Sequence, residues 1–125
     1  MQIIEFAYFT SGLKNTSFDM YTYAFRAITG DCDYAFSALL RAGYHWNGTG
    51  YDNPRVQELI ALGRKEPNPI KRLGIYFELQ KITLEDALWV PMFHENVSIG
   101  TQKYVKGFTP HPNGRPFFHK VSIDK

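Results

Sequence analysis

Two Asn-Pro pairs constrain what this chain can fold into more than any other feature. The pairs are Asn53-Pro54 and Asn68-Pro69. An asparagine side chain accepts hydrogen bonds from the first free N–H groups of a helix, and proline suits the first turn because its missing N–H has no partner there. The pairs therefore predict helices over about 54–65 and 69–87. The connection "KEPN" is too short for anything except an antiparallel helical hairpin.

Apolar residues in both segments recur near the helical period of 3.6. We expect one face of the first helix to carry Val56, Leu59, Ile60 and Gly63, and one face of the second to carry Leu73, Tyr76, Phe77, Leu84 and Ala87 together with the polar Gln80.

Other segments predict strands. β-branched and aromatic residues favour strands over 2–9, 18–25 and 88–100. Pro91 lies inside the last of these and places it at the edge or start of a strand. The tail has several prolines and glycines and predicts an irregular segment ending in a short strand, "FFHKVSI".

A further short helix is predicted over 34–42, ending at Gly43, where glycine tolerates a positive φ. Residues 43–53 contain three glycines and two asparagines and predict a loop. The resulting order of elements favours an α/β or α+β fold, in which helices pack on a mixed sheet.

Composition excludes several classes of function. The 125 residues suffice for one domain or part of one, with a net charge of only +2 and no basic run to follow phosphates, so nucleic-acid binding is not expected. One cysteine, Cys32, excludes an internal disulfide. No apolar stretch reaches the roughly 20 residues of a membrane span, and the first residues do not predict a signal peptide. Aromatic residues make up 16% of the chain, which indicates a dense core or stacking surfaces.

Asp31 and Asp33 lie between two Tyr-Ala-Phe triplets, at 23–25 and 34–36. One carboxylate can cap a turn or the helix that starts near Tyr34. Alternatively, one faces a pocket and binds a ligand. A shared catalytic site is disfavoured, because alternate residues of an extended segment point to opposite sides.

Other catalytic or metal-binding patterns are weak. The four histidines lack zinc-site spacing, and "ITGDCD" lacks the glycines of a phosphate-binding loop. Cys32 has no basic partner nearby in the sequence that would activate a thiol. We therefore expect no enzymatic turnover, no cofactor and no metal site.

The loop "GYHWNGTGY" concentrates Tyr44, Trp46 and Tyr51 among glycines. Loops on a rigid scaffold often carry binding residues, so Trp46 could stack on a ligand. It could equally fold back to cover the core.

Several motifs follow one another in a recognisable order. They are Gly50-Tyr51-Asp52-Asn53-Pro54-Arg55-Val56, then Arg72, Tyr76 and Gln80, then Glu85-Asp86, Trp89-Val90-Pro91-Met92-Phe93 and Val105-Lys106-Gly107-Phe108. In order and spacing they resemble the C-terminal part of the family 5 extracellular solute-binding proteins, the dipeptide, oligopeptide and nickel receptors of ABC importers. The resemblance covers about residues 1–110.

This resemblance implies a two-lobed periplasmic-binding-protein fold of type II. Residues 1–98 would form part of the C-terminal ligand-binding lobe, and residues 99–125 a return segment towards the first lobe. It implies a non-enzymatic, extracytoplasmic receptor, in the periplasm or tethered to the cell surface. Its partners would be the remaining lobes, an ABC permease and a small solute: a peptide, or alternatively an oligosaccharide or metal chelate. An autonomous protein-interaction module is the competing interpretation.

In the family, the stretch that follows the Phe-Asp strand lines the ligand cleft. Aligned on this pattern, Phe25 takes a tryptophan position, and Asp31 and Asp33 take the positions of two acids. Ile28 stands where peptide receptors carry the carboxylate that holds the ligand's α-ammonium. Either Asp31 fills that role through a shortened loop, or the receptor holds no amine there. The residues expected to face the ligand are Phe25, Arg26, Thr29, Asp31, Asp33 and Trp46.

Overall fold

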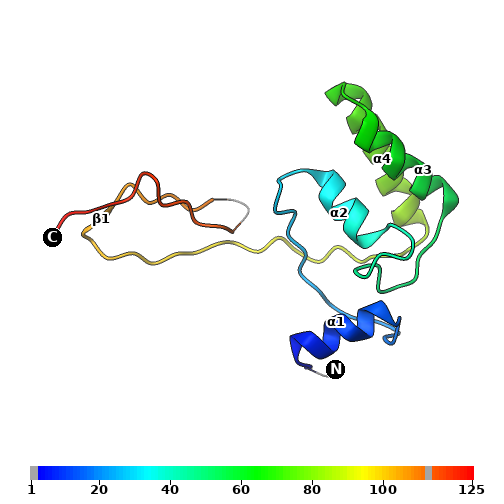
Figure 1. The fold of residues 1–125 in the computed structure, drawn as a ribbon, viewed down its shortest axis with the longest axis horizontal. Helices are drawn as coiled ribbons and strands as arrows, with labels where there is room; N and C mark the ends of the chain where they lie inside the picture. Colours follow the sequence, from blue (N-terminus) through cyan, green and yellow to red (C-terminus); the bar gives the residue numbers. More distant parts are fainter. Residues whose placement is uncertain (1–2, 112–113) are drawn as a thin grey trace. The chain divides into compact units, whose positions relative to one another are not determined.

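The computed structural model describes residues 3–111 and 114–125 (Figure 1). The chain divides into two compact units, Met1–Val90 and Pro91–Lys125. The first unit contains the helices and the second a small antiparallel strand pair.

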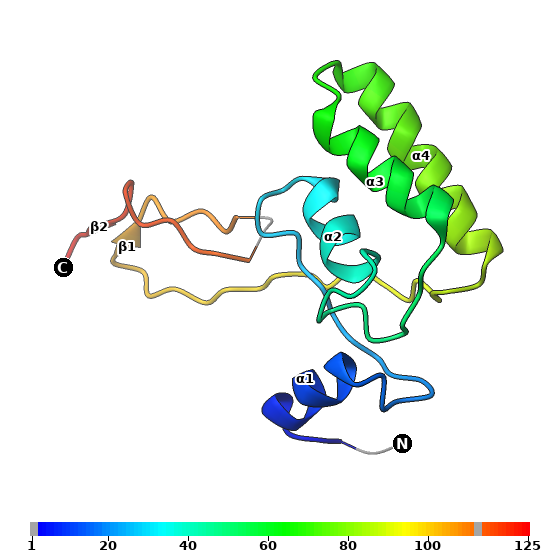
Figure 2. The same ribbon diagram turned by 45° about the vertical axis from the view of Figure 1, so that its right-hand side comes forward.

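The helical hairpin is confirmed. Helix α3 spans Pro54–Lys65 and helix α4 spans Pro69–Glu85, and the two lie side by side (Figure 2). Asn68 Oδ1 accepts hydrogen bonds from the backbone N–H groups of Ile70 and Lys71, at 3.0 and 3.1 Å. The Asn53 side chain caps α3 in the same way. Both starts follow from local chemistry within the first helical turn.

Helix α2 spans Cys32–Leu39 and begins two residues before the predicted Tyr34. The reason is the cap: the Asp31 side chain accepts a hydrogen bond from the Asp33 N–H at 2.8 Å. The helix ends before the predicted Ala42, with Leu40 as its C-cap. Gly43 has the expected positive φ, 69°, in the turn that follows.

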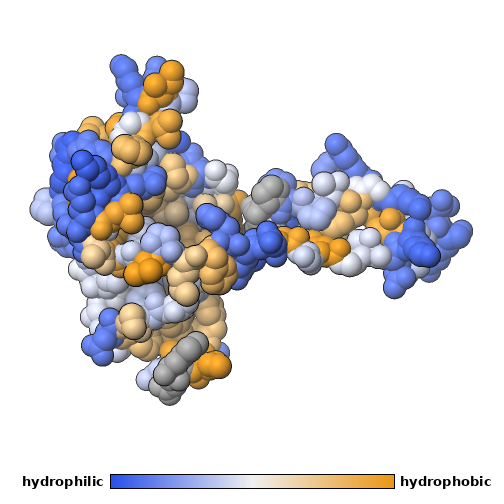
Figure 3. Space-filling model, turned by 180° about the vertical axis from the view of Figure 1, so that it is seen from behind, coloured by the Kyte–Doolittle hydropathy of each residue, from blue (hydrophilic) through white to orange (hydrophobic). Residues whose placement is uncertain are grey.

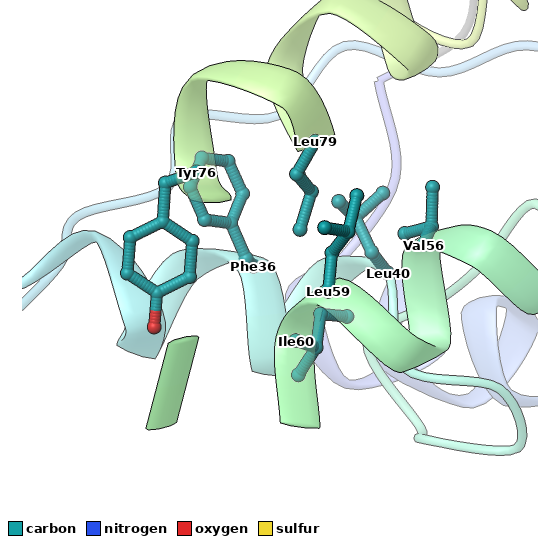
Figure 4. Packing of buried hydrophobic residues seen from close by; sticks show 7 residues of the cluster. All are labelled: Phe36, Leu40, Val56, Leu59, Ile60, Tyr76 and Leu79. Atoms are coloured by element: carbon teal, nitrogen blue, oxygen red, sulfur yellow. The ribbon is translucent and has the colours of Figure 1, made fainter. Parts of the chain in front are cut away.

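One hydrophobic core joins α2 to the hairpin (Figure 4). In this cluster, Tyr76 and Leu79 of α4 lie with residues of α2 and α3, and Leu79 is fully buried. The cluster comprises Phe36, Leu40, Val56, Leu59, Ile60, Tyr76 and Leu79. A side chain at Gly63 would collide with the Tyr76 ring, because an added Cβ would lie 2.6 Å from it.

The predicted face of α4 is partly wrong. Its buried residues are Tyr76, Leu79 and Thr83, which recur at i, i+3 and i+7. Helix α3 packs against α4, and Phe36 of α2 meets the Tyr76 ring. The other predicted residues are exposed: Leu73, Phe77, Gln80, Leu84 and Ala87. The space-filling view shows hydrophobic residues at the surface of this unit among charged ones (Figure 3).

The predicted N-terminal strand is instead a helix. Helix α1 spans Phe6–Lys14. Of the predicted 2–9 strand, residue 2 lies outside the described residues and residues 3–5 precede the helix. The carboxylate of Glu5 caps it by accepting hydrogen bonds from the N–H groups of Ala7 and Tyr8. Helix α1 then buries Phe9 and Leu13, so capping and packing override the strand propensity of its aromatic residues.

The segments 18–25 and 88–100 are also not strands. Phe18, Tyr21 and Tyr23 instead surround the ring of Phe9, at centroid distances of 5.4–5.7 Å. The aromatic side chains of 18–25 therefore pack around Phe9, whereas the sequence predicted a hydrogen-bonded strand there.

The predicted mixed sheet is not found in the described residues. Strand β1, Val105–Lys106, pairs antiparallel with β2, Ser122–Ile123, and Val105 lies opposite Ile123. The tail strand is thus confirmed only at its last two residues. In the ranges 3–111 and 114–125, the helices are too short or too polar to cross a bilayer.

Replacement of Leu79 by alanine should lower the free energy of unfolding by about 2–5 kcal/mol, because it opens a cavity in the core. Leu73→Ala is the matched control in the same helix, since Leu73 is 70% exposed, and should change the value by less than about 0.5 kcal/mol. Urea denaturation followed by circular dichroism at 222 nm measures both. Equal losses of unfolding free energy in the two variants would contradict the assignment of the buried face of α4.

Asn68→Ala should cost about 1 kcal/mol, because two N–H groups of α4 lose their acceptor. Asn68→Asp keeps an acceptor oxygen and should restore most of that loss. The same denaturation experiment separates the two variants, and an Asp variant as unstable as the Ala variant would contradict the capping role.

Candidate solute-binding site

Asp31 joins the start of α2 to α4. Its two carboxylate oxygens accept hydrogen bonds from Nη1 and Nη2 of Arg72, each at 2.8 Å. This two-pronged geometry is the strongest arrangement for an arginine and a carboxylate. Because Asp31 also caps α2, the helix-cap interpretation of this residue is confirmed.

Asp33 is held by three neighbours. The Tyr76 hydroxyl and the Ser37 hydroxyl both donate to its Oδ1, at 3.1 Å. Arg64 Nε of α3 lies 3.5 Å from Oδ2. Asp31 and Asp33 therefore both bind side chains of the hairpin, which fixes the N-terminal end of α2 against it.

The electrostatics of this cluster suit a structural role. The hydrogen bond from Arg72, supported by the Asp33 N–H, lowers the pKa of Asp31 below its usual range. Burial, with the neighbouring charge of Asp33, raises the pKa of Tyr76 to about 12. Asp31 thus stays charged and Tyr76 stays neutral near pH 7, whereas general acid–base groups need a pKa near the working pH.

Cys32 lies beside this cluster and is exposed. Partial burial of its sulfur and the charge of Asp31 raise the pKa of the thiol. A nucleophilic cysteine needs the opposite shift.

Phe25 and Trp46 lie close together in the structure. The Trp46 ring stacks on Tyr23 at 5.5 Å and meets Phe25 edge-on at 6.4 Å. Phe25 in turn stacks on Tyr34 at 5.7 Å. The two Tyr-Ala-Phe triplets thus meet through Phe25 and Tyr34, while Phe36 of the second triplet enters the core. We call Tyr23, Phe25, Tyr34 and Trp46 the aromatic wall.

A partly enclosed hollow of about 170 Å³ lies between α2, the loop that follows it and α3. Of the six predicted ligand-facing residues, Asp33 and Trp46 line it. The complete lining is Asp33, Tyr34, Ser37, Ala38, Arg41, Tyr44, Trp46 and Arg64.

The other predicted residues lie beside the hollow or away from it. Thr29 Oγ1 accepts a hydrogen bond from the Asp31 N–H at 3.3 Å, within the turn before α2. Arg26 is exposed. A ligand-binding role stays a prediction for all six residues, including Asp33 and Trp46, which line the hollow.

Sequence reasoning did not assign Arg41, Arg64 or Arg72 to the site, although Arg72 belongs to the motifs that carry the resemblance. A partial signal was present for one of them, because Tyr34, Ser37, Ala38 and Arg41 recur at helical spacing. No local pattern pairs Arg72 with Asp31, since 41 residues separate them.

Asn47 was also missed, and it organises the aromatic loop. Its side-chain amide donates to the backbone oxygens of Arg41 and Tyr51, while its Oδ1 accepts from the Tyr51 N–H. The side chain is buried and fully used. The loop that presents Trp46 is therefore held by internal hydrogen bonds.

Within the described ranges, no three His, Cys, Asp or Glu side chains lie close enough to hold a metal ion. The groups that line the hollow are guanidinium, carboxylate, hydroxyl and aromatic rings. They suit hydrogen bonding and stacking with an organic solute.

Comparison with known proteins finds similarity to solute-binding proteins at low identity. The chain is 28% identical to the "Probable di/tripeptide-binding protein 5" of Pseudomonas aeruginosa (strain UCBPP-PA14), over 100% of this chain and 24% of that protein. It is 27% identical to the "Glutathione-binding protein GsiB" of Escherichia coli (strain K12), over 82% of this chain and 21% of that protein. The resemblance to family 5 solute-binding proteins is confirmed.

The glutathione-binding protein of Shigella dysenteriae serotype 1 matches at the same identity of 27%. The chain spans about a quarter of the length of the curated relatives it matches. No protein-family model matches it.

Acid should weaken the folded state in part through Asp31. Its pKa is lowered by folding, so its contribution to stability is complete above the unfolded value of about 3.9 and is lost as the pH falls through the folded value. Asp31→Asn should be less stable than the wild type at pH 7, and the difference should shrink as the pH falls towards 2. Urea denaturation at a series of pH values measures this.

Asp31→Asn retains a capping acceptor, so the variant isolates the charge pair with Arg72. Asp19→Asn is the matched control, because Asp19 is exposed and forms no ion pair in the described part of the chain. If the free energy of unfolding of both variants changes with pH as that of the wild type does, the ion pair between Asp31 and Arg72 does not stabilise the fold.

Proposed function

We propose that this chain forms part of the C-terminal ligand-binding lobe in the solute-binding component of an ABC importer. Such a component captures a peptide or another small solute outside the cytoplasm and delivers it to a permease. Residues 1–98 belong to the lobe, and residues 99–125 form the segment that returns towards the first lobe. The observation that carries the proposal is the similarity of the whole chain to a di/tripeptide-binding protein.

The geometry of the first unit supports a binding role. The aromatic wall stands beside a hollow lined by two arginines and two hydroxyl-bearing aromatic side chains. Small-molecule sites combine apolar surface with a few placed polar groups in this way. The hydrogen bonds of Asn47 hold the Trp46 loop in place before any ligand binds.

The carboxylate of Asp31 is already bound by Arg72. A ligand ammonium would have to displace a guanidinium that already donates two parallel hydrogen bonds to it. This supports the interpretation in which the receptor holds no amine at the Ile28 position. Solutes without a free α-ammonium, including blocked peptides, sugars and chelates, are then compatible with the site.

Closure of two lobes around the solute would complete the site, with this chain supplying one wall. The remaining lobes and the permease are the protein partners in this proposal, and the compartment is the periplasm or the cell surface.

A thermal-shift screen of the protein encoded by the complete reading frame tests the proposal. A bound solute at 100 times its Kd should stabilise the folded state by about 2.7 kcal/mol and raise Tm by several degrees. The panel contains tripeptides, glutathione, oligosaccharides and nickel chelates. Trp46→Ala should reduce the shift, and Phe77→Ala, which removes an exposed ring outside the hollow, serves as control. A flat response across the panel would contradict a solute-binding function.

A further inference from the structure

Arg41 differs from the other arginines of helices α2 to α4 and their loops. Arg55 pairs with Glu58 and Glu78, Arg64 with Asp33, and Arg72 with Asp31. In the described part of the chain, no carboxylate lies within ion-pair distance of the Arg41 guanidinium. The guanidinium lies over the Tyr44 ring, whose centroid is 4.3 Å from Cζ. The N–H donors of Arg41 are therefore available at the edge of the hollow.

The backbone around Arg41 is held firmly. Gln57 of α3 donates to the Leu40 oxygen at 2.9 Å and accepts from the Ala42 N–H at 3.1 Å. The Arg41 oxygen itself accepts from the Asn47 side chain. Hydrogen bonds on both sides thus fix the backbone from which the long side chain extends, so little backbone entropy is lost when the side chain binds a partner.

The charges that line the hollow sum to one positive charge. Arg41 and Arg64 each contribute one, and Asp33 removes one through its contact with Arg64 at 3.5 Å. The unbalanced charge is that of Arg41. A single negative charge on a ligand would neutralise it, whereas a dianion would meet Asp33 as a repulsive neighbour.

The volume of the hollow suits one end of a solute rather than a complete solute. Its volume of about 170 Å³ is below the roughly 300–1,000 Å³ of complete small-molecule sites. The rings of Trp46 and Tyr34 form part of its lining. A charged group at Arg41 would therefore have flat, apolar surface beside it.

We propose that this hollow binds a carboxylate of the transported solute through the guanidinium of Arg41, with the adjoining flat or apolar part of the solute against Trp46 and Tyr34. The planar fork of arginine matches a carboxylate in two parallel hydrogen bonds. This inference rests on the proposed function, and it assigns the ligand class as organic acids.

A matched pair of probes tests the inference on the 125-residue chain. N-acetylphenylalanine and N-acetylphenylalaninamide have nearly the same shape, carry no ammonium and differ in one carboxylate. Two-dimensional ¹H–¹⁵N NMR follows the Trp46 indole N–H during titration. The acid should bind with a Kd on the order of 1 mM and at least tenfold more tightly than the amide. Equal affinities would overturn the inference.

Variants identify the residue responsible. Arg41→Gln should abolish the tenfold preference for the acid, and Arg41→Lys should retain part of it, because the charge remains without the fork. Arg55→Gln removes the same charge at a site outside the hollow and should leave the preference unchanged. An undisturbed Trp46 signal in each free variant shows that the loop is intact. A preference that survives Arg41→Gln would overturn the inference.

Phenyl phosphate as a third probe tests the class of anion. Tighter binding of the phosphate than of the acid would overturn the assignment to carboxylates. The outcome of the thermal-shift screen is separate. A solute that stabilises the receptor equally in the wild type and in Arg41→Gln contradicts this inference and leaves the proposed function standing. A receptor that binds no solute contradicts both.

Discussion

The contact between Asp31 and Arg72 is the constraint on which the first unit depends. It joins the first residue before α2 to the second turn of α4, and Asp33 adds contacts to Tyr76 and Arg64. The Asp31 side chain is 42% exposed, so the attraction is weakened by water and salt. Its main effect is on geometry, because two parallel hydrogen bonds fix the orientation of α2 on the hairpin. The hydrophobic core buries most of the apolar surface between these helices.

The candidate site follows from that orientation. With α2 fixed, Tyr34 lies where Phe25 can stack on it, and Arg41 reaches the hollow beside Trp46. Asp31 and Asp33 therefore position the candidate site, while the side chains of the hollow that can contact a solute are Arg41 and aromatic rings. The ion pairs of Asp31 and Asp33 thus stabilise the fold, whereas Arg41, which has no acidic partner among the described residues, is available for binding.

Several strands predicted from the sequence were wrong for one physical reason. Aromatic and β-branched residues favour a strand only where a neighbouring strand completes the hydrogen bonds. At the N-terminus, Glu5 caps a helix instead, and at 18–25 the rings pack around Phe9. The exposed second face of α4 was misassigned in a related way, because periodicity shows which residues share a face but not which neighbours cover it.

The sequence by itself determined the helical hairpin and the resemblance to solute-binding proteins, and it left helix capping as one of two roles open to Asp31 or Asp33. Caps and proline at the first helical position act within about three residues, so local sequence suffices to place them. Only the tertiary structure decided that Asp31 is bound by Arg72, that Phe25 and Trp46 meet, and that Arg41 has no acidic partner among the described residues. Such pairings join residues far apart in the chain, and their geometry depends on how the helices pack rather than on any spacing in the sequence.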